Sequence, residues 1–160
     1  MKNLLLKDGF DELDRAILEE LQANGRISNA DLARKIHLSQ PAVHNRIKRL
    51  EKKGVIQRYT AILDRDVVGY DLLCFIHISM DSHTAEIFEE FEQCVRSKPQ
   101  ITECHRLTGE YDALLKIVMR NRKELDAFIN DHIINLPGVG RVQTSIVLNE
   151  VKSTTTIPLK

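Results

Sequence analysis

Tryptophan is absent from these 160 residues, and phenylalanine and tyrosine together make up only 5 % of the chain. So few aromatic side chains argue against a large aromatic ligand cleft. The longest uninterrupted apolar run, residues 72–76, is far shorter than the roughly 20 residues that cross a bilayer. The N-terminal segment has only three consecutive apolar residues, too few for the hydrophobic region of a secretory signal. We therefore expect neither membrane association nor export.

Cysteine is scarce and poorly placed for a disulfide framework or a metal centre. Cys74, Cys94 and Cys104 are odd in number and have no metal-finger or CxxC spacing. His77, three residues after Cys74 in a predicted strand, points to the opposite face, and His105 is adjacent to Cys104. The fingerprints of nucleophile elbows, P-loops and dinucleotide sites are also missing. The sequence predicts no enzyme, no metal and no cofactor, in a chain kept reduced in the cytoplasm.

The chain has no overall excess of charge of one sign, because 23 basic and 23 acidic side chains give a net charge of zero. The balance is local: residues 1–64 carry +3 and residues 65–160 carry −3. Residues 26–58 contain nine basic side chains and only two acidic ones. This pattern is typical of a module that binds a polyanion, although a solvated helix face has the same composition.

Apolar periodicity predicts three helices in the first third of the chain, at about 11–23, 29–36 and 39–53. Ser28 and Ser39 are suited to cap the second and third helices. Two short helices joined by a tight turn, the second with a basic outer face, predict a helix-turn-helix. A three-helix packing unit that happens to be basic is the alternative interpretation.

The third of these helices divides into a core side and a polar side. Val43, Ile47 and Leu50 share the buried stripe, so the remaining side chains are available to DNA. Short side chains near the N-terminus of the helix can reach base edges in a major groove, and the later cations can neutralise phosphates. The predicted contacts to double-stranded DNA are Gln40, His44 and Asn45 to bases, Lys48, Arg49 and Lys52 to phosphates, with Ser39 and Pro41 beside them.

The rest of the chain has a β-α-β-β-α-β order, which is the ferredoxin-like split βαβ arrangement. The strands are expected at 72–80, 101–108, 113–119 and 142–151, and the helices at 85–96 and 122–135. The predicted fold class is therefore α+β: a winged helix-turn-helix domain with its linker strand over 1–63, and a ferredoxin-like domain over 64–160. That second domain is expected to bind a ligand and to form oligomers.

Some segments of this arrangement have more than one interpretation. Residues 55–63 fit either a short wing or the strand that links the domains, and the tail after residue 152 fits a short edge strand. Both helices should cover one face of the sheet, which leaves Leu73 and Phe75 on a bare face. That face predicts homodimerisation, with packing against the N-terminal domain as the alternative.

The motifs of both halves, taken in order, resemble the Lrp/AsnC family of transcriptional regulators (leucine-responsive and asparagine regulators, also called feast/famine proteins). The resemblance covers residues 11–152. Its motifs here are Leu13-Asp14, Arg26-Ile27-Ser28, the stretch from Arg46 to Ile56, Thr108-Gly109-Glu110-Tyr111-Asp112, Leu136-Pro137-Gly138-Val139, and Glu150-Val151-Lys152.

This resemblance implies a DNA-binding domain, an effector domain, and dimers that often assemble into tetramers or octamers. It also implies that a small molecule, usually an amino acid, binds between effector domains and changes assembly or DNA affinity. The implied pocket contains Leu107, Thr108, Gly109, Glu110, Tyr111 and Asp112, with Gln143, Thr144 and Ser145 on a facing strand. There Asp112 can accept hydrogen bonds from an α-ammonium and the Gly109 amide can donate to a carboxylate. An ordinary hairpin connection, with Asp112 capping its own backbone, is the alternative.

One position departs from the family pattern, and other functions fit the same architecture. Many members have glycine in the turn between the two DNA-binding helices, where this chain has His37; histidine tolerates a positive φ better than most residues, so the motif can survive there at some strain. Sirohaem decarboxylases resemble this family in architecture, but such an enzyme has no need of a basic outer face on the third helix. A ligand-binding module without a DNA role is a further alternative, against which the charge of residues 26–58 argues.

Overall fold

The computed structural model describes residues 9–159, which form two compact units. Unit 1 contains Met1–Ile62 and Lys152–Lys160, and unit 2 contains Leu63–Val151. This division differs from the expected one in the C-terminal tail, which the structure groups with unit 1. Among the described residues, no helix is long and apolar enough to cross a membrane.

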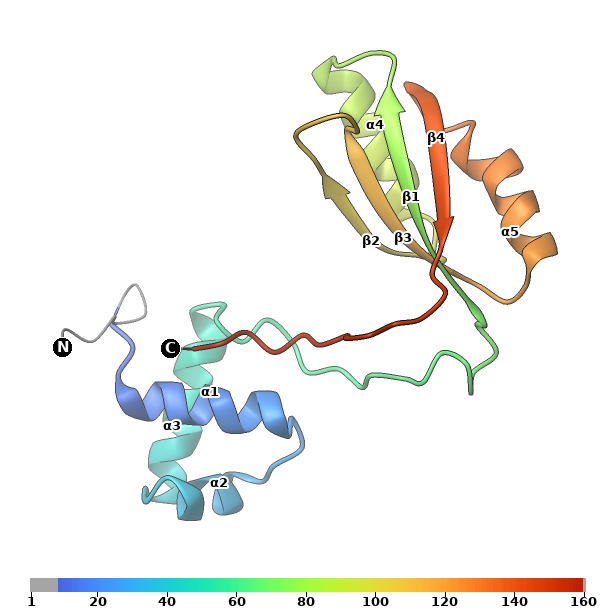
Figure 1. The fold of residues 1–160 in the computed structure, drawn as a ribbon. Coiled ribbons are helices and arrows are strands. Elements are labelled where there is room, and N and C mark those ends of the chain that lie inside the picture. Colours follow the sequence, from blue (N-terminus) through green and yellow to red (C-terminus); the bar gives the residue numbers. More distant parts are fainter. Residues whose placement is uncertain (1–8, 160) are drawn as a thin grey trace. The chain divides into compact units, whose positions relative to one another are not determined.

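Unit 1 is built on three helices, α1 (Glu12–Ala23), α2 (Asn29–Lys35) and α3 (Gln40–Lys52) (Figure 1). The expected caps determine where they begin. The side chains of Ser28 and Ser39 accept hydrogen bonds from backbone N–H groups in the first turns of α2 and α3. His37, in the turn between these helices, has a φ of 55°, a conformation that histidine tolerates better than most residues other than glycine.

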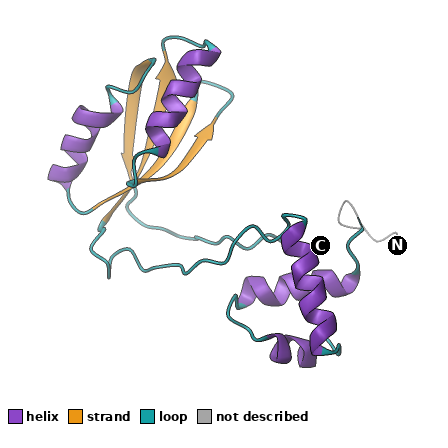
Figure 2. Ribbon diagram, turned by 180° about the vertical axis from the view of Figure 1, so that it is seen from behind, coloured by secondary structure: helices purple, strands orange, loops and turns teal. Residues whose placement is uncertain are grey.

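The core of unit 1 contains side chains from all three helices. Figure 2 shows the three helices packed against one another. The buried members of this core are Ile17, Leu18, Leu32, Ala33, Val43, Ile47 and Leu50. The C-terminal tail adds Leu159 to the edge of this core. Nearby, the side-chain amide of Gln22 donates to the carbonyl of Ile157 (3.1 Å) and accepts from its N–H (2.7 Å). These contacts explain why the tail belongs to unit 1.

Unit 2 has the predicted β-α-β-β-α-β order, and its sheet is antiparallel with strand order β2-β3-β1-β4. The strands are β1 (Leu72–Met80), β2 (Ile101–Arg106), β3 (Ala113–Met119) and β4 (Val139–Ile146). The helices are α4 (Ala85–Arg96) and α5 (Arg122–Phe128), and α5 continues into a π-helical turn, η1 (Ile129–Ile133). The ferredoxin-like prediction is therefore confirmed.

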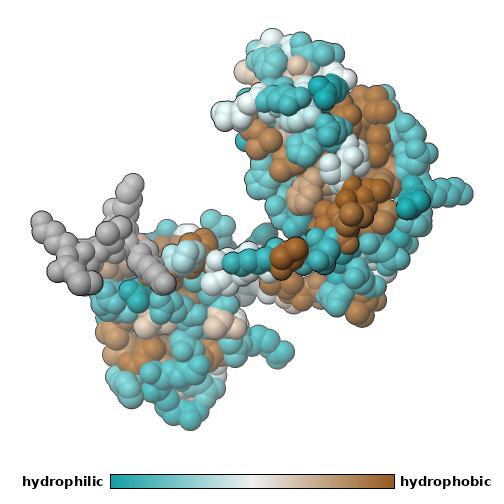
Figure 3. Space-filling model, in the orientation of Figure 1, coloured by the Kyte–Doolittle hydropathy of each residue, from teal (hydrophilic) through white to brown (hydrophobic). Residues whose placement is uncertain are grey.

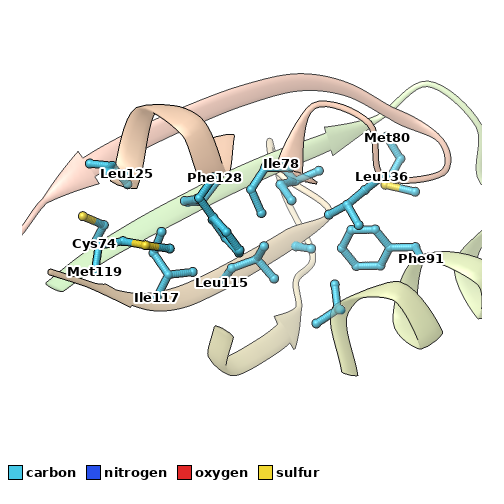
Figure 4. Close-up of a cluster of buried hydrophobic side chains, with 14 of the residues drawn as sticks. Cys74, Ile78, Met80, Phe91, Leu115, Ile117, Met119, Leu125, Phe128 and Leu136 are labelled. Atoms are coloured by element: carbon cyan, nitrogen blue, oxygen red, sulfur yellow. The ribbon is translucent and has the colours of Figure 1, made fainter. Parts of the chain in front are cut away.

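Both helices lie on one face of this sheet, where the core of unit 2 forms (Figure 4). Alternate residues of β1, from Cys74 to Met80, pack there against Phe91 of α4 and Phe128 of α5. Among the described residues of unit 2, no helix lies on the other face (Figure 2). Phe75, Leu114 and Val118 are half-buried on that face, and hydrophobic patches are visible across it (Figure 3).

Several predicted boundaries were wrong. The last strand begins at Val139 rather than 142 and ends at Ile146 rather than 151, because it pairs only along β1, from Met80 to Cys74. The helix expected over 122–135 becomes π-helical at Ile129. Residues 57–64 and the described part of the tail, 152–159, contain no strand, because an extended segment becomes a strand only when it has a partner.

Candidate DNA-binding and effector sites

The outer surface of α3 carries the predicted DNA contacts. Val43, Ile47 and Leu50 anchor the helix in the core of unit 1, so the other sides of the helix face outward. The predicted contacts that are exposed there are Ser39, Gln40, Pro41, His44, Asn45, Lys48, Arg49 and Lys52. The surface is therefore polar at its N-terminal end and cationic at its C-terminal end, as the helical period predicts.

His44 is held in place by a neighbouring helix. Its Nδ1 lies 3.4 Å from Nδ2 of Asn29, at the first position of α2. This contact joins the two helices of the motif at the polar end of α3. The imidazole therefore has a defined orientation beside Asn45, while Lys48 and Lys52 extend from the exposed surface further along.

Arg49 has a second role that the sequence pattern did not indicate. Its Nη2 lies 2.5 Å from Oδ2 of Asp14, and Nη1 of Arg46 lies 2.8 Å from Oδ1 of the same carboxylate. Asp14 is completely buried, so α1 presents a desolvated negative charge that two arginines of α3 neutralise. The nearby Asp11 has a lowered pKa, because its carboxylate accepts a hydrogen bond from the Asp14 backbone and pairs with Arg46. The arginines thus fix α3 against α1.

A hollow of about 300 Å³ lies beside α3 in unit 1. Leu21, Ile27 and Ile47 provide its apolar lining, and Tyr59 from the segment after α3 borders it. The Tyr59 hydroxyl donates to a carboxylate oxygen of Glu51 (3.1 Å), and burial together with this carboxylate raises the pKa of Tyr59 to about 12. Sequence reasoning missed this contact, which fastens the chain after α3 back onto the helix.

In unit 2, the turn between β2 and β3 is anchored by Asp112. Its N–H donates to the carbonyl of Ile78 and its carbonyl accepts from the N–H of Leu107, both at 2.8 Å. Its side chain bonds to other segments: Oδ2 accepts from the N–H of Met80 (2.7 Å), and Oδ1 lies 2.9 Å from Nε2 of His83. The Met80 N–H, then His83 and Arg106, lower the pKa of Asp112. The simple hairpin interpretation required Asp112 to cap its own backbone. Its side chain instead bonds to Met80 and His83.

Tyr111 extends over the bare face of the sheet. The centroid of its ring lies 4.9 Å from the ring centroid of His77 on β1, and its hydroxyl donates to the side-chain oxygen of Gln143 on β4. Arg141 adds a hydrogen bond to the same hydroxyl (3.4 Å) and an ion pair with Glu110 (3.5 Å). The turn and the facing strand therefore meet through polar side chains of both signs.

The structure separates some of the predicted effector residues. Gln143 and Ser145 lie on the bare face opposite His77 and Phe75, whereas Thr144, between them, lies on the helix-covered face opposite Ile76. The remaining turn residues are exposed. They are Leu107, Thr108, Glu110 and Gly109, and Gly109 has a φ of 131° that side chains rarely adopt. His77, His83 and Arg141 were missed because they lie in other segments of the sequence.

Two family models match the chain, one in each half. Residues 10–57 match a winged helix-turn-helix DNA-binding domain, and residues 73–157 match the Lrp/AsnC ligand binding domain. The matches lie over α1–α3 and over the ferredoxin-like sheet with the segment that follows it.

Relatives of known name and structure cover nearly the whole chain. The leucine-responsive regulatory protein of Haemophilus influenzae is 39 % identical, over 94 % of this chain and 91 % of its own length. The structure of a transcriptional regulator of Neisseria meningitidis, a complex with L-methionine, superimposes with a TM-score of 0.90 at 35 % identity, over 94 % and 97 % of the two chains. The structure of an AsnC family regulator of Agrobacterium tumefaciens superimposes with a TM-score of 0.88 at 34 % identity, over the same shares of the two chains. The matched relatives are regulators and not enzymes, and this chain belongs to the Lrp/AsnC family of DNA-binding transcriptional regulators.

Proposed function

We propose that the protein is a homo-oligomeric regulator that binds specific double-stranded DNA sequences, and that an amino acid changes its assembly or its DNA affinity. The observation that carries this proposal is the presence, in one chain, of an Lrp/AsnC ligand-binding domain and a helix-turn-helix whose α3 has an exposed polar and cationic surface. The regulator family is established above, so the proposal concerns the roles of particular residues and the class of effector.

On the DNA-binding unit, we assign base contacts to Gln40, His44 and Asn45, because they are exposed near the N-terminus of α3. Amide side chains can form paired hydrogen bonds with an adenine edge in the major groove. Lys48 and Lys52 are assigned to phosphates, which determine position and affinity rather than sequence preference. Arg49 keeps 45 % of its side chain exposed, so a phosphate contact is compatible with its ion pair to Asp14.

On unit 2, the effector class is inferred from relatives and from the charges around the turn. The Neisseria relative is described in complex with L-methionine and the Haemophilus relative is named leucine-responsive. An amino acid needs an anionic partner for its ammonium and a donor for its carboxylate. Asp112 provides the carboxylate, and Arg141 or the amide of Gly109 provides the donor.

Dimerisation is assigned to the bare face of the sheet. Phe75, Leu114 and Val118 form an apolar strip there that a monomer leaves half-exposed, and apolar strips of this kind mark protein interfaces. A second copy meeting it through a two-fold axis covers the strip on both chains at once. We therefore expect Phe75→Glu to convert the wild-type assembly to smaller species in light scattering, whereas Glu86→Gln, on the exposed side of α4, leaves the mass unchanged. An unchanged mass for Phe75→Glu would contradict this interface.

The decisive experiment selects random duplex DNA with the purified protein at two salt concentrations, with and without a mixture of the twenty amino acids. We expect a motif with approximate two-fold symmetry, whose enrichment changes when the mixture is present. Removing amino acids from the mixture one at a time then identifies the effector. If no motif is enriched and all binding disappears at the higher salt, then α3 binds DNA only through charge and the assignment of base contacts is wrong.

A further inference from the structure

Both carboxylate oxygens of Asp112 already have partners within the chain. Oδ2 accepts a hydrogen bond from the Met80 N–H, and Oδ1 lies 2.9 Å from Nε2 of His83. The two partners differ in how easily they can leave. The Met80 N–H belongs to the end of β1, whereas the His83 side chain lies in the loop after β1 and is 61 % exposed.

The backbone of Asp112 prevents the carboxylate from turning to offer a different oxygen. Its N–H and carbonyl are bonded to Ile78 and Leu107, and its Oδ2 is bonded to Met80. Each carboxylate oxygen can accept more than one hydrogen bond, but Oδ1 is the oxygen whose partner is an exposed side chain, so a new cation meets the carboxylate most readily there. That position holds the imidazole, at a distance typical of a charge-assisted N–H···O contact.

We propose that His83 occupies on Asp112 the place that the ammonium group of an amino-acid effector takes, so that the imidazole and the effector compete for Oδ1. The inference rests on the proposed function, because it concerns the same turn and the same class of ligand. Displacement needs no change in the sheet: the imidazole moves into water, and the carboxylate stays fixed by Met80. His83 is thus an internal competitor that sets the effector concentration at which the protein responds.

The charges around this pair determine the direction of its pH dependence. Asp112 faces the Met80 N–H from β1, His83 from the following loop and Arg106 from β2. His83 faces Asp112 and, from α4, the ring of Phe88 at 6.1 Å, over which Arg106 also lies at 3.8 Å. Histidine is the side-chain type whose charge ordinarily changes between pH 5 and 8, whereas arginine stays charged throughout that range. The lowered pKa of Asp112 keeps the carboxylate ionised over that range.

Protonation of His83 strengthens its pair with Asp112 and therefore opposes the effector. A free amino acid keeps both its ammonium and its carboxylate charged between pH 5.5 and 7.5. The affinity of the full-length protein for the effector should therefore rise by about fivefold over this range, the upper value for an exposed ion pair. A purely structural role for His83 predicts the opposite: weaker effector binding when the side chain is lost, at either pH.

The test is calorimetric titration of the full-length wild type and of His83→Gln with L-methionine and with L-leucine, at pH 5.5 and 7.5. Glutamine retains polarity at the position but cannot become charged. We expect His83→Gln to bind more tightly than the wild type at pH 5.5 and to vary less than about twofold with pH. His132→Gln, which alters an exposed histidine on η1, should keep the wild-type pH dependence.

The outcomes separate the inference from the proposed function. If the wild type binds an amino acid and His83→Gln keeps the full pH dependence, or binds more weakly at both pH values, the competition is refuted and the effector assignment stands. If neither of these amino acids nor any of the other eighteen binds the wild type, the effector half of the proposed function fails and the competition fails with it.

Discussion

Replacing Asp14 should loosen the whole DNA-binding unit, although the residue touches no DNA in the proposed arrangement. The Asp14 carboxylate is completely buried and accepts from Arg46 (2.8 Å), from Arg49 (2.5 Å) and from the N–H of Asp11 (3.3 Å). Removing one partner of a buried ion pair costs about 3–5 kcal/mol. The arginine side chains are 22 % and 45 % exposed and regain water when released, so we expect the lower value, about 3 kcal/mol, for Asp14→Ala.

Amide hydrogen exchange of the full-length protein measures this loss where it occurs. A loss of about 3 kcal/mol corresponds to roughly 100-fold faster exchange, provided that these amides exchange through unfolding of the unit. We expect this acceleration in α1, α2 and α3 and none in the sheet of unit 2, because the two units have separate cores. Glu12→Ala is the matched control: it removes an exposed carboxylate from the same first turn of α1. An acceleration by Asp14→Ala of less than threefold would refute the view that this charge cluster holds α3 against α1.

Three further predictions concern four single substitutions. Lys52→Ala should reduce the slope of log DNA affinity against log salt concentration by about one unit without changing stability, whereas Arg49→Ala should also lower the stability of unit 1. DNA-binding titrations and urea unfolding check these two variants. If Arg49→Ala causes no loss of stability, the contact with Asp14 is unimportant for stability. Gly138→Ala should destabilise unit 2 by about 2 kcal/mol or more, because φ is 71° there and a Cβ would overlap the side chain of Ile87; unchanged thermal unfolding of the sheet would contradict this. Leu159→Ala should destabilise unit 1 by about 1–2 kcal/mol if the tail contributes to its core, and equal hydrogen exchange in α1 would show that it does not.

The elements that the sequence predicted well are those whose signals are local. The apolar stripe of α3 and the capping serines Ser28 and Ser39 specify helix positions without reference to the rest of the chain. The alternation along β1 likewise separated its covered face from its bare face.

Features that depend on distant partners could not be predicted in this way. The ends of β4 are determined by how far β1 extends beside it, so the polar alternation of the last strand gave a range displaced toward the C-terminus. The contact of the tail with unit 1 was not predicted for the same reason, since Gln22, 135 residues before Ile157 in the chain, provides its partner. Similarly, the helical wheel placed Arg49 on the outer side of α3, and only the position of α1 shows that its guanidinium reaches Asp14.

The partners of the candidate effector site could not be predicted from the sequence either. Spacing and resemblance identify Asp112 as a carboxylate suited to an ammonium group, but they do not show that both of its oxygens already have partners. A ligand that binds a fully solvated carboxylate exchanges only water, whereas a ligand that binds Asp112 also exchanges His83. The measured affinity is then the difference between the effector and the imidazole as partners of one carboxylate. Asp112→Ala is a poor test of the effector site, because it also removes the anchor of the turn. His83→Gln leaves that anchor in place and is therefore the sharper test.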